Sequence, residues 1–434
     1  MNKEQPNQKR VNEGVDKMKS SPDFKLVIHG FDWGPGYSKM IIDIKKEILN
    51  LPDSFVQIEA KKQYTSFNMD KREIKSVDGE SEVPILAHYL SDSIGNKVNS
   101  PSRYVTVELE VHPDNVFTNP FNYSFETGFN SYTEIDYTIT QLNTVQTIDN
   151  KEISGFVLSS KELTEVFEPE AALFETGVHS YVDRWGKDLK LSYASYTPKE
   201  MESKRPLIIM LHGAGEGGTD PRIALYGNKS VSLVSNTVQD IFDGAHVLAP
   251  QSPTMWMDDG HGAYTKNGES KYTAALLDLI EDYIHNNHVD DERVYVGGGS
   301  NGGYMTVNLL LSKPELFAAA FPICQAYSSD WISDNQLMTI KEIPIWFVHC
   351  RNDQVVPYQS TTQELVERLT ELGSSDVRST IYDHVIDTSG NYTDDNGESY
   401  KYNDHWSWIY VYNNEIEDNG LSLFEWLASK KQTN

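Results

Sequence analysis

The chain has 434 residues, 38% of them hydrophobic, and a formal net charge of −27. This length favours more than one domain, and the acidic surface argues against nucleic acid as a partner because it repels phosphate backbones. No stretch of about 18 apolar residues is present, so we expect no membrane-spanning helix.

Residues 1–22 are polar and charged, and we expect them to be disordered. They lack the apolar core of a signal peptide. The sequence therefore leaves two localisations open for a soluble protein, namely the cytoplasm or secretion after loss of a signal segment.

Residues 23–145 consist of short β-rich runs broken by turn residues. The clearest runs are residues 26–28, 39–44, 56–58 and 105–111. The last alternates apolar and polar side chains, as a strand with one wet face does. Such strands, separated by Gly, Asn, Asp and Ser, indicate a small all-β sandwich. Residues 146–164 are mixed and charged, and we expect them to link this domain to the next.

Residues 165–434 alternate between apolar strands and helix-like segments. A first strand is predicted over residues 189–194, and buried strands over 206–211 and 345–348. Between Tyr272 and Tyr283 apolar residues recur at helical spacing. This alternation predicts an α/β domain with a doubly wound, mostly parallel sheet covered on both faces.

The most informative stretch contains the pattern Gly298-x-Ser300-x-Gly302. A β-rich run leads into it and a helix-like segment follows, which is the layout of a nucleophile elbow. Such a turn is strained, and side chains at the two glycines would collide with the neighbouring strand and helix. The pattern alone is common, so its partners must decide whether Ser300 is a nucleophile or an ordinary turn residue.

The residues that could act together with Ser300 lie both before and after it in the sequence. The stretch His212–Gly218 follows one buried strand, Asp353 follows another, and His405 lies near the C-terminus. A serine hydroxyl needs a base within hydrogen-bond reach, and that base needs a carboxylate to orient it. We therefore predict a triad with Ser300 as nucleophile, His405 as general base and acid, and Asp353 as the orienting carboxylate.

Other residues compete for two of these roles. Asp383 and Asp404 are alternatives to Asp353, and His384 is an alternative to His405. Asp353 is favoured because it follows a buried strand, at the edge where ligands gather in open α/β folds. Asp383 and His384 fall within a β-rich run, Asp404 would point away from the adjacent histidine, and His405 follows a polar loop.

An oxyanion formed during acyl transfer needs backbone N–H donors that are fixed in advance. We predict one donor at Asn301, directly after the nucleophile, and another at Ala214 or Gly215. His212 has a structural role in this interpretation. Glu216 either contacts substrate or ties down its loop, and we favour the second role.

Trp256 is predicted to form one wall of the substrate site, with a packed aromatic as the alternative. Tyr327 is a weaker candidate of the same kind. Cys324 and Cys350 each follow a predicted core strand, and we expect them to be free thiols. Neither has metal-ligand spacing, so no metal or other cofactor is expected.

Residues 165–434 resemble the catalytic domain of an α/β-hydrolase of the esterase and prolyl-oligopeptidase-like group. The matching motifs are His212–Glu216, Pro250–Pro253, Gly298–Gly303, Asp353–Pro357 and His405 with its following tryptophans. The N-terminal part resembles the immunoglobulin-like domain that precedes the hydrolase in certain bacterial esterases, on the stretches Gly30–Gly36 and Tyr104–Leu109.

This resemblance implies a carboxylesterase that acts on a small-molecule ester through an acyl-enzyme. It also implies that the immunoglobulin-like domain shapes access to the site or mediates assembly into a homo-oligomer. Two alternatives remain open. One is a serine peptidase of the prolyl-oligopeptidase-like type, and the other is a non-catalytic binding protein on a hydrolase scaffold.

Overall fold

The computed structural model describes residues 21–68, 73–183, 186–199 and 203–432. The chain divides into two compact units. The first comprises Met1–His29, Pro35–Asn122 and Tyr132–Pro169, and the second comprises Gly30–Gly34, Tyr123–Ser131 and Glu170–Asn434. Of the segment expected to be disordered, residues 1–20 lie outside the described residues.

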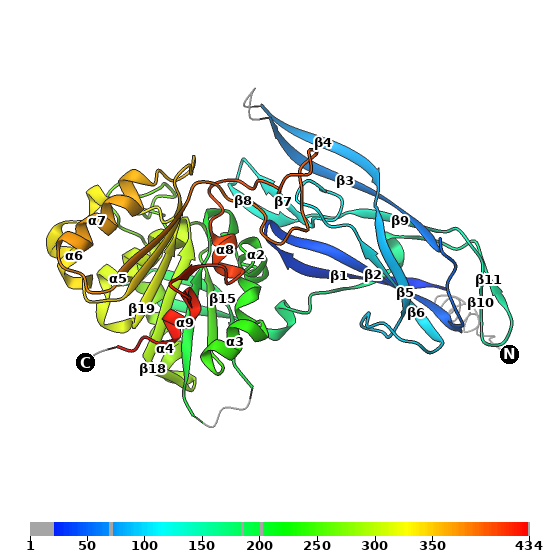
Figure 1. Ribbon diagram of the computed structural model, residues 1–434, viewed down its shortest axis with the longest axis horizontal. Coiled ribbons are helices and arrows are strands. Elements are labelled where there is room, and N and C mark those ends of the chain that lie inside the picture. The colour runs from blue at the N-terminus through cyan, green and yellow to red at the C-terminus, as the bar shows by residue number, and fades with distance from the viewer. Residues whose placement is uncertain (1–20, 69–72, 184–185, 200–202, 433–434) are drawn as a thin grey trace, which may run out of the picture. The chain divides into compact units, whose positions relative to one another are not determined.

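The first unit is a β-sandwich (Figure 1). One sheet has the strand order β13-β1-β2-β6-β5 and the other has the order β12-β9-β3-β4. The first sheet contains β1 (Asp23–Phe31), β2 (Gly34–Ile48), β5 (Ile85–Ser91), β6 (Ser102–Leu109) and β13 (Leu163–Phe167). The second contains β3 (Val56–Asn68), β4 (Glu73–Glu82), β9 (Asp136–Gln141) and β12 (Val157–Ser159). This architecture confirms the predicted immunoglobulin-like sandwich of strands.

The segment 146–164, expected to be a linker, contributes to both sheets. Its β12 pairs antiparallel with β9, and β13, which begins at Leu163, pairs parallel with β1. The mixed, charged sequence shows no apolar alternation that would mark these strands, and the partner of β13 lies far away along the chain. The shorter elements nearby are β7 (Phe121–Ser124), β8 (Phe129–Tyr132), β10 (Val145–Gln146), β11 (Glu152–Ile153), η1 (Ser160–Glu162) and η2 (Ala171–Leu173).

The second unit contains an eight-stranded sheet with the order β14-β15-β17-β16-β18-β19-β20-β21. Its strands are β14 (Glu175–Val182), β15 (Asp188–Tyr196), β16 (Arg205–Leu211), β17 (His246–Gln251), β18 (Val289–Gly299), β19 (Ala319–Ile323), β20 (Ile345–Cys350) and β21 (Val377–Tyr382). Among the described strands, β15 runs antiparallel to its neighbours β14 and β17, whereas the pairs from β17 to β21 are parallel. The predicted mostly parallel sheet is confirmed.

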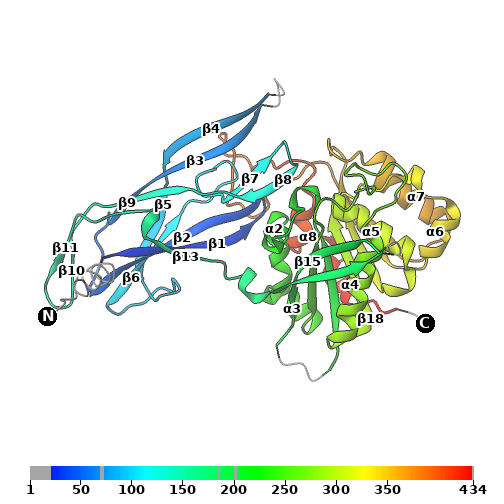
Figure 2. The same ribbon diagram turned by 180° about the vertical axis from the view of Figure 1, so that it is seen from behind.

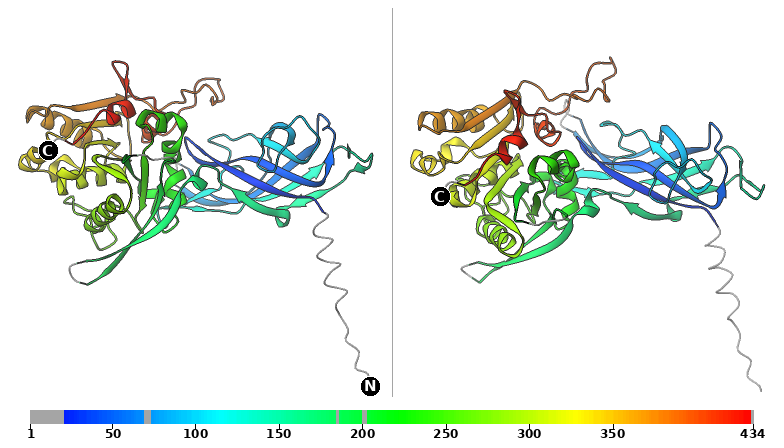
Figure 3. Two further views of the ribbon diagram at one scale, coloured as in Figure 1. Left: turned by 90° about the horizontal axis from the view of Figure 1, so that it is seen from below. Right: turned by 60° about the horizontal axis from the view of Figure 1, so that its bottom comes forward.

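Helices cover both faces of this sheet (Figures 1, 2 and 3). They are α2 (Pro221–Gly227), α3 (Asn236–Phe242), α4 (Thr273–Asn286), α5 (Asn301–Ser312), α6 (Asp334–Ile340), α7 (Glu364–Glu371), α8 (Trp408–Tyr412) and α9 (Leu423–Ala428). Shorter elements are η3 (Ala214–Glu216), η4 (Ser230–Val234), η5 (Pro314–Leu316), η6 (Ser329–Trp331), η7 (Gln359–Gln363), β22 (Glu417–Asp418) and β23 (Leu421–Ser422). Among the described residues, no helix combines the length and apolar character needed to cross a membrane.

Strand β18 shows why both faces are buried. Successive side chains of a strand point to opposite faces. Val294 and Val296 join the core beneath α4 and α5, whereas Tyr295 packs on Phe242 of α3 with ring centroids 5.8 Å apart. Phe242 in turn contacts Phe424 of α9. The strand that leads to Ser300 is therefore held firmly between two helical layers.

Candidate active site

Ser300 occupies a sharp turn between strand β18 and helix α5. Its backbone has φ 58° and ψ −113°, a strained conformation for a residue other than glycine. A Cβ atom at Gly298 would lie 2.2 Å from the Leu211 carbonyl oxygen, and one at Gly302 would lie 1.9 Å from it. Both glycines are therefore required sterically, as expected, although the obstacle in both cases is the end of β16.

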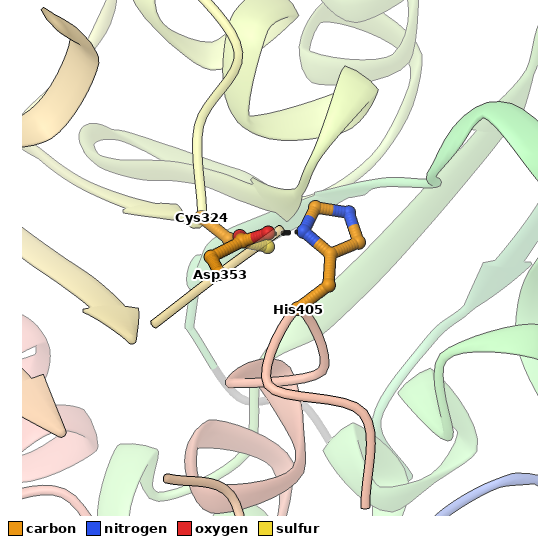
Figure 4. A group of neighbouring side chains, drawn as sticks. All are labelled: Cys324, Asp353 and His405. Atoms are coloured by element: carbon orange, nitrogen blue, oxygen red, sulfur yellow. Dashed lines mark hydrogen bonds and ion pairs between the residues drawn. The ribbon is translucent and has the colours of Figure 1, made fainter. Parts of the chain in front are cut away.

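Asp353 and His405 meet at the carboxyl end of the sheet (Figure 4). His405 Nδ1 lies 2.6 Å from Asp353 Oδ2. Because a carboxylate can only accept, Nδ1 carries the proton and donates it. This leaves Nε2 as the nitrogen that can accept a proton from another group. The structure thus brings together two of the three residues of the predicted triad.

The Asp353 carboxylate is held by further donors. Its Oδ1 accepts hydrogen bonds from the backbone N–H groups of Val355 and Val356, at 2.7 and 2.9 Å. Its Oδ2 also accepts from His349 Nε2 at 3.2 Å. Burial raises the pKa of Asp353, but the hydrogen bonds from His349 and His405 outweigh burial and hold this pKa well below its usual range. Asp353 is therefore a carboxylate at neutral pH.

His405 is a buried imidazole beside two groups that favour its charged form. Burial lowers the pKa of His405, whereas the neighbouring Cys324 sulfur and the Asp353 carboxylate raise it, and the net direction is upward. The ring packs edge-on against Trp408, with centroids 5.6 Å apart. Trp408 also lies against the elbow, because a Cβ atom at Gly299 would be 3.1 Å from its ring.

The third member of the predicted triad is not yet engaged. Within the described residues, no hydrogen bond joins the Ser300 hydroxyl to His405. Catalytic hydrogen bonds are often long in ligand-free enzymes and tighten when substrate binds. The activation of Ser300 by His405 therefore stays a prediction.

The loop after β16 carries the predicted oxyanion donors, and His212 anchors it. The His212 ring is buried and donates from Nδ1 to the Gly213 carbonyl at 2.6 Å. The Ser252 N–H donates to its Nε2 at 3.0 Å, so the ring is neutral, and burial lowers the pKa of His212 to about 4. This agrees with the structural role expected for His212.

Two N–H groups of this loop donate hydrogen bonds within the protein. Gly213 N–H donates to Asn228 Oδ1 at 3.2 Å, and Glu216 N–H turns back to the Gly213 carbonyl at 3.4 Å. In the part of the chain that the structure describes, the N–H groups of Ala214 and Gly215 remain available as donors.

Asn301 is the first residue of α5, where backbone N–H groups have no partner within the helix. Its side chain accepts a hydrogen bond from Met257 N–H at 3.3 Å. The Asn301 N–H is thus placed beside Ser300 and is suited to the predicted oxyanion role, which stays a prediction.

Trp256 was predicted as a wall of the substrate site, but it is buried and forms no open surface. Its side chain is 0% exposed and packs between His212 and Tyr272, at centroid distances of 5.0 and 6.0 Å. The indole fills the core beneath the oxyanion loop because so large an apolar surface is stabilised by burial. A substrate could reach it only after these neighbours moved. Tyr327 is likewise buried, stacked on Tyr304.

The competing residues pair with groups other than His405 and Asp353. His384 Nδ1 pairs with Asp404 at 3.1 Å, and Asp383 pairs with Arg351 at 3.1 Å. Strand β21 ends at Tyr382, so Asp383 and His384 are exposed loop residues and do not lie within a strand.

Two residues at the site were not recognised as such from the sequence. His349 lies on β20 and donates to Asp353, while its Nδ1 accepts from Thr362 at 2.8 Å. Cys324 is buried, and its sulfur lies within 4.8 Å of the Asp353 and His405 donor atoms (Figure 4). The only available signal for His349 was its position four residues before Asp353 on the same strand end.

Cys324, Asp353 and His405 together have the donor types that zinc prefers. However, a metal ion there would have to separate His405 Nδ1 from Asp353 Oδ2, which are hydrogen-bonded at 2.6 Å. The arrangement therefore fits a histidine–carboxylate pair better than a metal centre. Cys324 and Cys350 are both free thiols, as expected.

Both parts of the chain are similar to known protein families. Residues 23–154 match the family model of the esterase immunoglobulin-like N-terminal domain, and residues 196–390 match that of phospholipases and carboxylesterases. A solved structure described as a thermostable esterase is 26% identical with a TM-score of 0.75, and the match covers 94% of this chain and 99% of that one.

Curated relatives match shorter stretches. The poly(3-hydroxybutyrate) depolymerase of Ralstonia pickettii is 26% identical over 39% of this chain and 36% of its own length. Acetylxylan esterase A of Emericella nidulans is 28% identical over 29% of this chain and 38% of its own length. The chain thus spans only about a third of the length of the first curated relatives that it matches.

Proposed function

We propose that this chain, which belongs through residues 196–390 to the phospholipase and carboxylesterase family and carries an esterase immunoglobulin-like domain over residues 23–154, is a serine carboxylesterase. The observation that carries the proposal is the 2.6 Å hydrogen bond from His405 to the buried Asp353 carboxylate. It leaves Nε2 of His405 free to serve a nucleophile, and Ser300 stands on the strained elbow that such a nucleophile occupies.

In the acylation half-reaction, Ser300 Oγ attacks the ester carbonyl carbon while its proton passes to His405 Nε2. The Asp353 carboxylate stabilises the imidazolium that forms. The tetrahedral intermediate then collapses, the bond between the carbonyl carbon and the alcohol oxygen breaks, and His405 returns the proton to the leaving alcohol. Ser300 is left as an acyl ester.

In the deacylation half-reaction, His405 Nε2 removes a proton from water, whose oxygen attacks the acyl carbon. Collapse of the second intermediate breaks the bond to Ser300 Oγ, and His405 returns the proton to the serine. The carboxylic acid leaves, and the three side chains regain their starting states. All the proton transfers are carried by residues of this chain.

Negative charge develops on the carbonyl oxygen in both steps. We assign the N–H of Asn301 and that of Ala214 or Gly215 as its donors. Support comes from the backbone of the loop, where Gly213 and Glu216 use their N–H groups internally and the two residues between them do not. Preorganised donors of this kind are worth about 10²–10³ in kcat each.

Carboxylic esters of alcohols are the substrate class that fits this chemistry. The relatives named above act on acetylated xylan or on a polyester, according to their names. These substrates share one bond type, an ester between a carboxylic acid and an alcohol. We propose that this chain hydrolyses that type of bond.

Two measurements test the proposal. Purified protein is treated with a fluorescent fluorophosphonate, and hydrolysis of p-nitrophenyl acetate is followed by absorbance. We expect the wild type to be labelled and active, and Ser300→Ala to be neither. Ser375→Ala, an exposed serine, is the matched control and should behave as wild type. An unlabelled, inactive wild type would favour a binding protein, and turnover of an alanyl anilide at or above the ester rate would favour a peptidase.

A further inference from the structure

The segment Tyr123–Ser131 lies far before the catalytic motifs in the sequence, yet it belongs to the same compact unit as they do. It forms the turn between β7 and β8 with the adjoining residues of both strands. No catalytic motif marks this segment. Its contacts, however, are with the loop that carries the proposed oxyanion donors.

A hydrogen bond joins the segment to this loop. Asn130 Nδ2 donates to Glu216 Oε1 at 3.0 Å, across 86 residues of sequence. Glu216 directly follows Ala214 and Gly215, and all three form the short helix η3. The Glu216 side chain therefore belongs to the same helical turn as the two N–H groups.

The segment also packs directly on the loop backbone. A Cβ atom at Gly215 would lie 3.2 Å from Asn130 Nδ2 and 3.7 Å from the Tyr123 ring. A Cβ atom at Gly217 would lie 2.8 Å from the Phe129 ring. The loop glycines on both sides of Glu216 therefore face this segment at close range, which limits the movement of the loop in that direction.

The Glu216 carboxyl is enclosed. The residue is 6% exposed, and a Cβ atom at Gly213 or Gly227 would come within 2.8 Å of its side chain. Burial raises the pKa of Glu216 to about 7, and the hydrogen bond from Asn130 acts in the opposite direction. The titratable groups that influence or respond to this carboxyl are His405 and Tyr123. A buried carboxyl that loses a donor is destabilised and tends to move.

We propose that Asn130 is a positioning residue, which fixes Glu216 and so holds the Ala214 and Gly215 N–H groups where the oxyanion develops. The segment Tyr123–Ser131 is then a required part of the esterase site, although it touches no reacting atom. This inference rests on the proposed function, because it assigns Asn130 a role in the same ester hydrolysis.

The test exchanges the donor and the acceptor. Asn130→Ala removes the donor, and Asn130→Asp places a second carboxyl against Glu216. Glu216→Gln retains an acceptor for Asn130. The double variant Asn130→Asp with Glu216→Gln restores a donor–acceptor pair in the reverse direction. Glu126→Gln, an exposed carboxyl of the same segment, is the matched control. The readouts are kcat and KM for p-nitrophenyl acetate, the rate of fluorophosphonate labelling, and the thermal midpoint.

We expect Asn130→Ala to lower kcat and the labelling rate by about 10-fold or more, since complete loss of one donor costs about 10²–10³. KM should change less than twofold because ground-state binding is retained. Asn130→Asp should lose more activity relative to wild type at pH 9 than at pH 6, because two ionised carboxyls repel each other. The double variant should recover to within about threefold of Glu216→Gln, since one amide–carboxylate pair is restored.

Wild-type kcat in Asn130→Ala, or a thermal midpoint that falls with kcat unchanged, overturns the inference. So does a double variant no more active than Asn130→Asp. If Asn130→Ala does not fold, the comparison of the double variant with its two single parents decides. Failure of the proposed function is distinguishable, because Ser300→Ala would then keep the wild-type rate or the wild type would have none.

Discussion

Replacing Asp353 by Asn tests the proposed triad most directly. The carboxylate holds His405 through a buried 2.6 Å hydrogen bond, and its other oxygen is fixed by two backbone N–H groups. An amide at this position keeps the shape, so the fold should be retained. Its NH₂ group, however, favours the imidazole tautomer with the proton on Nε2, which cannot accept from Ser300.

The expected loss is a factor of about 10³–10⁴ in kcat, as found when a triad carboxylate is made an amide. At 1.36 kcal/mol per factor of ten, this equals about 4–5.5 kcal/mol of transition-state stabilisation. The acid limb of the kcat/KM profile should also move to lower pH. Asp353 is one of the groups that raise the pKa of His405, and His405 must be neutral to act as a base.

Stability gives a second readout with a defined sign. The pKa of Asp353 is lowered in the folded state. Its carboxylate therefore contributes stability that is present above the unfolded pKa of about 3.9 and is lost as the pH falls. In Asp353→Asn this part of the acid dependence disappears, so the thermal midpoint should fall less steeply below pH 5.

The assay is p-nitrophenyl acetate hydrolysis from pH 5 to pH 10, with thermal unfolding measured in parallel. Asp383→Asn and Asp404→Asn are the matched controls, because these carboxylates pair with Arg351 and His384 instead. Both controls should stay within about threefold of wild type, because an amide keeps the shape of each carboxylate and neither carboxylate is hydrogen-bonded to His405. A greater loss in either control than in Asp353→Asn would refute the assignment of the carboxylate.

Three further outcomes are expected. Gly302→Ala should destabilise the fold by about 3 kcal/mol or more, measured by urea unfolding, because its Cβ would lie 1.9 Å from the Leu211 carbonyl oxygen; a variant as stable as wild type would contradict the observed elbow. Cys324→Ala should shift the acid limb of the kcat/KM profile to lower pH, since its sulfur raises the pKa of His405, and a shift upward would count against this. His349→Gln, which can still donate to the Asp353 carboxylate, should retain more than about a third of wild-type kcat, whereas His349→Leu should lose about 10-fold or more. Equal rates in the two variants would show that the hydrogen bond from residue 349 is not the cause of the loss.

Local patterns predicted much of the second unit. The elbow glycines, the buried strand before Asp353 and the loop position of His405 all rest on neighbouring residues along the chain, which a sequence displays directly. His405, which was predicted in preference to His384, does contact Asp353. The prediction that His384 lies within a strand was wrong, since His384 is on an exposed loop.

Contacts between distant segments could not be predicted in the same way. Strand β13 pairs with β1, which lies at the other end of the first unit in the sequence. A mixed and charged run therefore looked like a linker. Trp256 reads equally well as a wall or as core, because only packing decides between them. The hydrogen bond from Asn130 to Glu216 has no sequence pattern, since its two ends are 86 residues apart and Asn130 belongs to no motif.

The end of strand β16 positions two parts of the proposed active site. The Leu211 carbonyl lies against Gly298 and Gly302 on either side of Ser300, and the loop with the proposed oxyanion donors leaves the strand at His212. The hydroxyl proposed to attack and the amides proposed to receive the negative charge are thus both positioned by one short piece of backbone. A shift of this piece of backbone would therefore move the proposed nucleophile and the proposed donors together.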